Sequence, residues 1–361
     1  MSFEIDFLPI DGGDSLGDAI ALRYGTDERQ KVIVYDAGTQ STGLALVHHI
    51  RQHFQTSKID HLVASHPDAQ HVAGLSVLLR QMQVGVLWMH RPWLHSEEVQ
   101  AYFEFGNYQH PGLKEIWEAK LRDLYELEQL AFEKGVVIKE PFRGQWIGNF
   151  HVLSPDKDWY VKHLLPQFNQ PIGSPNHLLR FLRCLRKTAK RAVRWVAEQW
   201  DTEYLPEVGH TSAENESSVV LYSNLEDYHY GVMLTGHAGV EALHASLDYL
   251  RELNFDPVKH LQFWQVPHHG ALEHLSTQVL NRLLGEPLDS KPKTIRKVAF
   301  ISTPKNSNYP HPSISNALLR RGLKVVATEG KTKRHQKNAG VSSAWHTTQS
   351  LGFIQEIERE D

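Results

Sequence analysis

Three loops of the sequence place histidines directly after short apolar runs of the kind that form buried β-strands. Their histidines are His66, His71, His237, His268 and His269. In α/β proteins, binding sites form at the carboxyl ends of strands, so side chains from such loops can converge on one point. Neutral imidazole is the commonest protein ligand for zinc-type ions. The three loops together therefore predict a metal site in which histidine is the main ligand.

The composition leaves histidine as the soft metal ligand of this chain. Its 361 residues contain 23 histidines and one cysteine. A single cysteine excludes a disulfide framework and a cysteine-rich zinc site. The formal net charge is −4, from 38 basic and 42 acidic residues, which argues against coating nucleic acid through bulk charge.

The sequence shows no targeting or membrane segment. Its N-terminus, M-S-F-E-I-D-F-L-P-I, lacks the basic region and the long apolar core of a secretory signal. No window approaches the ~18 consecutive apolar residues of a transmembrane helix. We therefore expect a cytoplasmic protein that makes no contact with a membrane.

The elements that must hold the histidine loops read as alternating strands and helices. Expected strands cover residues 3–10, 19–24, 32–35, 61–64, 84–89, 218–223, 230–234, 261–266, 297–302 and 323–328. Helical spacing begins at residue 71 and recurs at residues 113–134, 240–253 and 313–321. Residues 155–175 contain four prolines and read as an irregular excursion. The alternation predicts an α/β protein with a layered core.

A basic stretch interrupts this alternation. Residues 177–200 read as a helix whose basic side chains fall mostly along one stripe: Arg180, Arg183, Arg186, Lys187, Lys190, Arg191 and Arg194. Such a stripe repels itself unless an anion is near. The candidate partners are nucleic acid or another anionic polymer, an acidic protein, and the acidic helix expected at residues 113–134. A second basic cluster, at residues 331–337, reads as a glycine-flanked loop.

Several short motifs occur in a characteristic order along the chain. They are Gly17-Asp18-Ala19-Ile20, Tyr35-Asp36-Ala37-Gly38, His66-Pro67-Asp68-Ala69-Gln70-His71, Asn215-Glu216-Ser217-Ser218, Leu234-Thr235-Gly236-His237, His268-His269-Gly270 and Tyr309-Pro310-His311-Pro312-Ser313. In this order they resemble the metallo-β-lactamase-fold proteins, and most of all the soluble hydrolase domain of bacterial competence DNA-uptake (ComEC-type) proteins. The resemblance spans about residues 3–90 and 210–330.

The resemblance implies a fold and a domain organisation. The fold is α/β, a four-layer αβ/βα sandwich with metal at its edge. We expect a single domain over residues 1–361, with an insertion at about residues 155–210 that carries the basic helix.

The resemblance also implies a ligand set. His66, His71 and one of His268 and His269 correspond to histidine ligands of the family. Asp68 occupies a position that is histidine or aspartate among relatives, so it is a candidate oxygen ligand.

Two positions depart from the family pattern. His237 and Gln70 stand where the family has aspartates, so two anionic side chains are replaced by neutral ones. Because two divalent ions repel each other unless carboxylates lie nearby, this favours one zinc ion over two ions. Gln70 and His311 are the candidate catalytic residues beside the metal. Asp18 and Asp36 are expected to organise turns.

The leading functional prediction is a metal-dependent hydrolase, a phosphodiesterase or nuclease that acts through a metal-bound hydroxide. In this reading the basic helix holds the polyanionic substrate. A non-catalytic binding or regulatory subunit is the alternative, because Gln70 and His237 are neutral. Hydrolysis of a small ester, thioester or lactone is a third option, since the fold also supports it. A protein partner is compatible with each of these.

Overall fold

The fold is given by a computed structural model that describes residues 2–10, 17–26, 29–104, 112–168, 193–206, 209, 211–225, 230–339 and 347–360. These residues form two seven-stranded sheets and one two-stranded sheet. The first sheet has the order β15 (Lys333–Lys337), β1 (Ser2–Phe7), β2 (Ala19–Thr26), β3 (Arg29–Ala37), β4 (Lys58–Val63), β5 (Gln83–Trp88) and β6 (Val137–Lys139). The second has the order β14 (Leu323–Ala327), β13 (Lys297–Ile301), β12 (Leu261–Gln265), β11 (Gly231–Leu234), β10 (Val220–Asn224), β8 (Phe150–Ser154) and β7 (Trp146–Ile147).

Each large sheet contains a parallel half. Strands β3 to β6 run parallel in the first sheet, and β11 to β14 run parallel in the second. The remaining pairs in both sheets are antiparallel. The carboxyl ends of the parallel strands therefore gather their loops at one edge of each sheet.

The two large sheets pack face to face. Strand alternation sends Phe3, Ile5 and Phe7 of β1 into a core that also receives Phe263 and Phe300 from the second sheet. The rings of Phe7 and Phe300 lie 5.3 Å apart, centroid to centroid. This aromatic layer joins the sheets.

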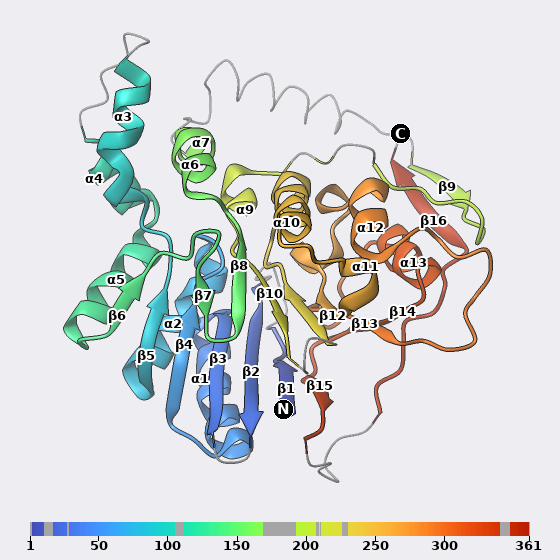
Figure 1. Cartoon of the computed structure of the whole chain (residues 1–361), viewed down its shortest axis with the longest axis horizontal. Helices are drawn as coiled ribbons and strands as arrows, with labels where there is room; N and C mark the ends of the chain where they lie inside the picture. The colour runs from blue at the N-terminus through green and yellow to red at the C-terminus, as the bar shows by residue number, and fades with distance from the viewer. Residues whose placement is uncertain are drawn as a thin grey trace.

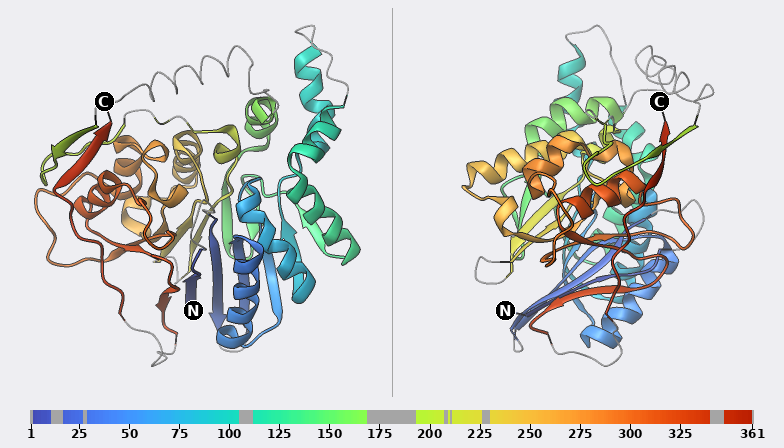
Figure 2. Two further views of the ribbon diagram at one scale, coloured as in Figure 1. Left: turned by 180° about the vertical axis from the view of Figure 1, so that it is seen from behind. Right: turned by 90° about the vertical axis from the view of Figure 1, so that its right-hand side faces the viewer.

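Helices cover the outer faces of the sandwich. The first sheet carries α1 (Gln40–His49), α2 (Ala69–Gln81) and α5 (Arg122–Glu133), whose apolar sides fill a second core. The second sheet carries α10 (Val240–Glu252), α12 (Thr277–Leu284) and α13 (Pro312–Arg320), which fill a third core. Figures 1 and 2 show helices outside and sheets inside. The expected four-layer α/β sandwich is confirmed.

Shorter elements complete the described chain. The helical ones are η1 (Ile50–Phe54), η2 (Pro92–His95), α3 (Ser96–Glu104), α4 (Leu113–Lys120), α6 (Lys157–Trp159), η3 (Tyr160–Leu164), α7 (Leu165–Phe168), α9 (Ala213–Glu216), α11 (Pro257–His260), η4 (Pro267–Gly270) and η5 (Leu272–His274). The two-stranded sheet pairs β9 (Val193–Ala197) with β16 (Glu356–Glu360). No helix among the described residues has both the length and the apolar character needed to cross a bilayer.

Two expected elements differ in the middle of the chain. The helix expected at residues 113–134 is broken into α4 and α5 at Leu121, whose backbone (φ −108°, ψ 42°) is not helical. The segment expected to be irregular is helical over residues 157–168. Asp156 explains this start, because its side chain accepts hydrogen bonds from the backbone N–H groups of Asp158 and Trp159.

The expected basic helix at residues 177–200 is wrong over its last part, where Val193–Ala197 forms strand β9. Two β-branched valines favour an extended backbone there, and β16 supplies the antiparallel partner. Arg194 therefore belongs to a strand. The other basic residues of the predicted stripe, at positions 180 to 191, lie outside the described residues.

The second basic cluster is also a strand, not a loop. Lys333–Lys337 forms β15, which pairs with β1 at the edge of the first sheet. Arg334 contacts the carboxylates of Glu4 and Asp6 at 3.0 Å and 2.5 Å. His335 faces the other side and stacks on Phe263 with ring centroids 4.6 Å apart. Ion pairing and ring packing thus hold a half-buried edge strand that contains no Val, Ile, Leu or Phe.

Candidate metal centre

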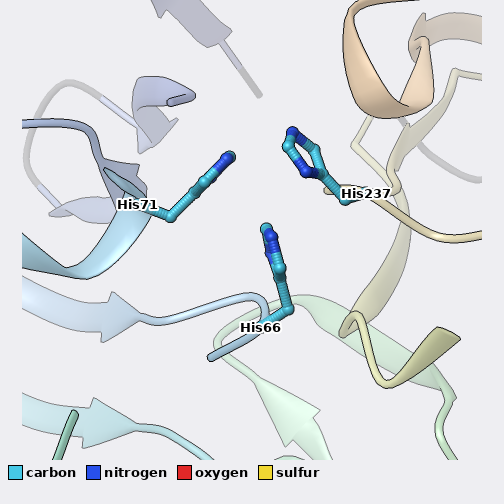
Figure 3. Close-up of side chains that lie close together, drawn as sticks. All are labelled: His66, His71 and His237. Atoms are coloured by element: carbon cyan, nitrogen blue, oxygen red, sulfur yellow. The ribbon is translucent and has the colours of Figure 1, made fainter. Parts of the chain in front are cut away.

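Three buried histidines from two loops converge on one point. His66 follows β4, His71 lies in the first turn of α2, and His237 follows β11. Their ring centroids are 4.2 to 4.5 Å apart. One nitrogen of each ring lies within 4.8 Å of one nitrogen of each of the others. Figure 3 shows the three side chains pointing toward one another from the two sheets.

Local backbone features bring these loops together. Asp68 caps α2 by accepting the backbone N–H of Gln70 at 2.8 Å, which fixes where the helix starts and where His71 points. Gly236 turns the chain with φ +53° just before His237. A Cβ at position 236 would lie 2.8 Å from the Tyr35 hydroxyl and 2.9 Å from Ser65 Oγ. Only glycine therefore lets the β11 loop approach the ends of β3 and β4.

One buried carboxylate, that of Asp36, orients two of the three rings. It accepts the backbone N–H of Ser65 at 2.8 Å and the Ser65 hydroxyl at 2.5 Å. Nδ1 of His71 lies 3.1 Å from Asp36 Oδ2, and Nδ1 of His66 lies 2.8 Å from Ser65 Oγ. Both rings are thus engaged through Nδ1. This arrangement favours a free lone pair on each Nε2.

The Nε2 atoms of His66 and His71 are buried and have no hydrogen-bond partner. Leaving a buried polar atom unpaired costs about 1–3 kcal/mol, so such atoms call for an unseen partner. Zinc binds imidazole nitrogens at about 2.0–2.1 Å, and tetrahedral ligands at that distance lie ~3.3 Å apart. Three nitrogens within 4.8 Å of one another fit a single ion of this kind.

The electrostatics keep most of the cluster neutral. Burial, followed by the charges of neighbouring histidines, lowers the pKa of His66 and His237 well below the usual value. Burial also acts to lower the pKa of His71, but the hydrogen bond and charge of Asp36 outweigh it and the pKa is raised. Burial raises the pKa of Asp36, against the opposing effect of His71 and Ser65.

Further imidazoles surround His237. Its Nε2 lies 3.2 Å from Nε2 of His269, whose Nδ1 donates to the carbonyl of Ser302 at 2.7 Å. His268 packs against His237 with ring centroids 4.3 Å apart and stacks on His274 at 4.0 Å. Burial lowers the pKa of His268 to about 2 and that of His274 to about 4. Of the pair that sequence reasoning left open, His269 is the one that presents a nitrogen to His237.

The other predicted site residues lie around the cluster. Among the described residues, potential ligands gather as His66, His71 and His237 and, beside them, as Asp18, Asp36 and His71. Asp68 belongs to neither group, and its side chain caps α2. Gln70 is half-buried in the first turn of α2. His311 caps α13, where its Nδ1 accepts the N–H of Ser313 at 3.2 Å. Its backbone N–H donates to the carbonyl of Gly270 at 3.0 Å, which ties it to the loop of His268 and His269.

Several residues that shape the site carry no signal in the sequence. His274 follows no strand, so nothing in its neighbourhood separates it from the other histidines of the chain. Ser65 and Ser302 act through a hydroxyl and a backbone carbonyl, and such contacts depend on tertiary structure. Asp36 was expected to organise a turn, and it does bind the Ser65 backbone.

No family model matches the sequence, and no curated protein matches it. Solved structures that are similar include a putative metallo-β-lactamase from Thermotoga maritima, at 10% identity and a TM-score of 0.31, covering 65% of this chain and 79% of that one. A metallo-β-lactamase from Pontibacter korlensis is 11% identical with a TM-score of 0.28, over 70% and 82% of the two chains. A flavodiiron core from Synechocystis is 12% identical with a TM-score of 0.34, over 91% and 72%.

Proposed function

We propose that this chain is a metal-dependent hydrolase with one zinc-type ion at His66, His71 and His237. The observation that carries the proposal is the pair of buried, unpartnered Nε2 atoms on His66 and His71, beside a third imidazole. His269, whose Nε2 faces that of His237, borders the fourth coordination position, which a catalytic ion must leave to water. An all-imidazole set suits zinc, copper or nickel better than magnesium or manganese.

In the proposed reaction the ion would activate water, and the residues of the chain orient the ligands and supply a proton. When bound, a divalent ion here would acidify a coordinated water and polarise the bond under attack. Asp36 holds the His71 ring, and through Ser65 it holds that of His66, so both nitrogens stay aimed at one point. His311 accepts a hydrogen bond on Nδ1, which in the neutral ring puts its proton on Nε2. From its place in the motifs we assign His311 the role of proton donor to the leaving oxygen.

A phosphodiester, in nucleic acid, is the substrate we favour. The support is the resemblance of the ordered motifs to competence DNA-uptake hydrolases, together with the basic residues at positions 180 to 194 of the sequence. Neutral histidines leave the site without ligand carboxylates that would repel a phosphate.

A non-catalytic binding subunit is the second candidate. The three-histidine group contains no carboxylate, and Gln70 and His237 are neutral where the family has acids. If His269 also binds the ion, four imidazoles would fill the position that a water needs, and the site would hold an ion without turnover.

Metal content and turnover test these candidates together. Protein purified without chelator should hold about one equivalent of zinc, and less than roughly a tenth of an equivalent contradicts the proposal. The holoprotein is then assayed with bis(4-nitrophenyl) phosphate, an oligonucleotide, 4-nitrophenyl acetate and a lactone. His66→Ala should lose metal and turnover together, whereas His163→Ala, at an exposed histidine of η3, should lose neither. Bound zinc with no turnover on any substrate would favour the binding subunit.

A further inference from the structure

Gln265 lies at the end of β12, is 1% exposed and bonds to both halves of the site. Its Oε1 accepts the backbone N–H groups of Thr235 at 2.6 Å and Gly236 at 2.8 Å. Its Nε2 donates to Asp18 Oδ2 and to the Gly236 carbonyl, each at 3.1 Å. Both ends of the carboxamide are therefore engaged.

The partners of Gln265 lead directly to the cluster histidines. Thr235 and Gly236 form the turn that ends at His237, in the second sheet. Asp18 precedes β2 of the first sheet, and its backbone N lies 3.3 Å from Nδ1 of His71. Gln265 thus connects the backbone that presents His237 with the backbone against which His71 rests. We call this set of hydrogen bonds the Gln265 bridge.

The partners require a carboxamide at this position. Two N–H groups face one end of the side chain, so that end must accept; a carboxylate and a carbonyl face the other end, so that end must donate. A glutamate would place a second acceptor against Asp18. An aliphatic side chain would leave these buried polar groups, and the Val266 carbonyl beside them, without this partner.

We infer that Gln265 is a positioning residue that sets the spacing between His237 and the pair His66 and His71. The inference rests on the proposed function, since the spacing matters for an ion shared by all three. Gln265 itself binds no metal; it acts through the Thr235–Gly236 turn and through Asp18.

Reversing the polarity of the bridge provides the test. Gln265→Glu should weaken zinc affinity about 10–100-fold, measured by competition with a chromophoric chelator, as is usual when a residue that orients metal ligands is lost. Adding Asp18→Asn supplies a donor opposite the new acceptor. The double variant should therefore bind zinc at least about tenfold more tightly than Gln265→Glu alone. Asn316→Asp is the matched control, because it places an acid beside Glu198 at a buried amide on α13. It should lower the melting temperature and leave zinc affinity unchanged.

Each outcome decides the inference. An unchanged affinity in Gln265→Glu overturns it, and so does a loss that Asp18→Asn fails to recover. If the parent protein binds no zinc, the proposed function fails while the bridge is still testable. Chemical denaturation of the metal-free variants then measures the coupling between positions 18 and 265. Additive effects would overturn the bridge, and a favourable coupling would support it.

Discussion

At the scale of single residues, the site depends on Asp36. The motif resemblance predicts aspartates at the positions of Gln70 and His237, and this chain has neutral side chains there. Asp36 supplies negative charge behind the ligand rings. It contacts His71 directly and His66 through Ser65. The buried carboxylate therefore acts on the ligand rings and not on the ion.

Asp36→Asn should weaken zinc binding by about 10–100-fold. Asparagine tolerates the φ of +57° at this position, so the backbone turn should survive. An amide N–H facing Nδ1 of His71 would shift the ring proton to Nε2 and remove the lone pair that the ion needs. Chelator competition measures the loss. Asp60→Asn, at a buried carboxylate of β4 paired with Lys31 and Lys58, serves as control and should retain the affinity of the parent.

At the scale of elements, each ligand is presented by the end of a strand or the start of a helix. Asp68 could act either as a metal ligand or as a helix cap. Its position in the motif makes it a candidate ligand, whereas its side chain caps α2 and so determines where His71 lies. Replacing Asp68 should remove metal if it is a ligand and should destabilise α2 if it is a cap.

Asp68→Ala should lower the free energy of unfolding by about 1 kcal/mol, the usual cost of losing a helix cap. Zinc stoichiometry should stay at the parent value. Urea denaturation and elemental analysis of the same preparation measure the two quantities. Asp156→Ala, which removes the corresponding cap of α6, should give a similar destabilisation. Loss of the ion in Asp68→Ala alone would instead identify Asp68 as a ligand.

The elements that the sequence predicts well are those with apolar patterns. Alternation and helical spacing locate the strands and helices around His66, His237 and His269 to within a few residues. The edge strand β15 is not predicted by apolar alternation, because ion pairs hold Arg334 in place and ring stacking holds His335. Strand β9 is also not predicted, since its partner β16 lies far away in the sequence. Long-range pairing has no local signature.

At the scale of the whole molecule, burial of neutral histidines couples stability to pH. His90 is 4% exposed, and neither of its ring nitrogens has a hydrogen-bond partner. Burial lowers its pKa to about 3. Because this lies below the value of ~6.5 in the unfolded chain, acid protonates the unfolded state first. The contribution is fully present above pH ~6.5 and is lost as the pH falls toward 3.

His90→Phe should therefore flatten the acid side of the stability curve. At pH 5 the parent should have lost about 2 kcal/mol through this group relative to pH 7, at ~1.4 kcal/mol per pH unit, and the variant should not. Urea denaturation at both pH values measures the difference. For His163→Phe, at an exposed histidine, the free energy of unfolding should change with pH as it does in the parent. Parallel curves for His90→Phe as well would contradict the prediction.

The division of the three histidines between the two sheets has a consequence for how the protein matures. His66 follows β4 of the first sheet and His71 lies in the adjoining α2, whereas His237 follows β11 of the second sheet, much later in the chain. Long-range contacts of this kind form late in folding, after the entropy of closing a large loop has been overcome. With His66 and His71 alone, an ion would have two of the three proposed ligands and would be held weakly. Tight metal capture would then report that both sheets have docked, which makes it a signal of completed folding.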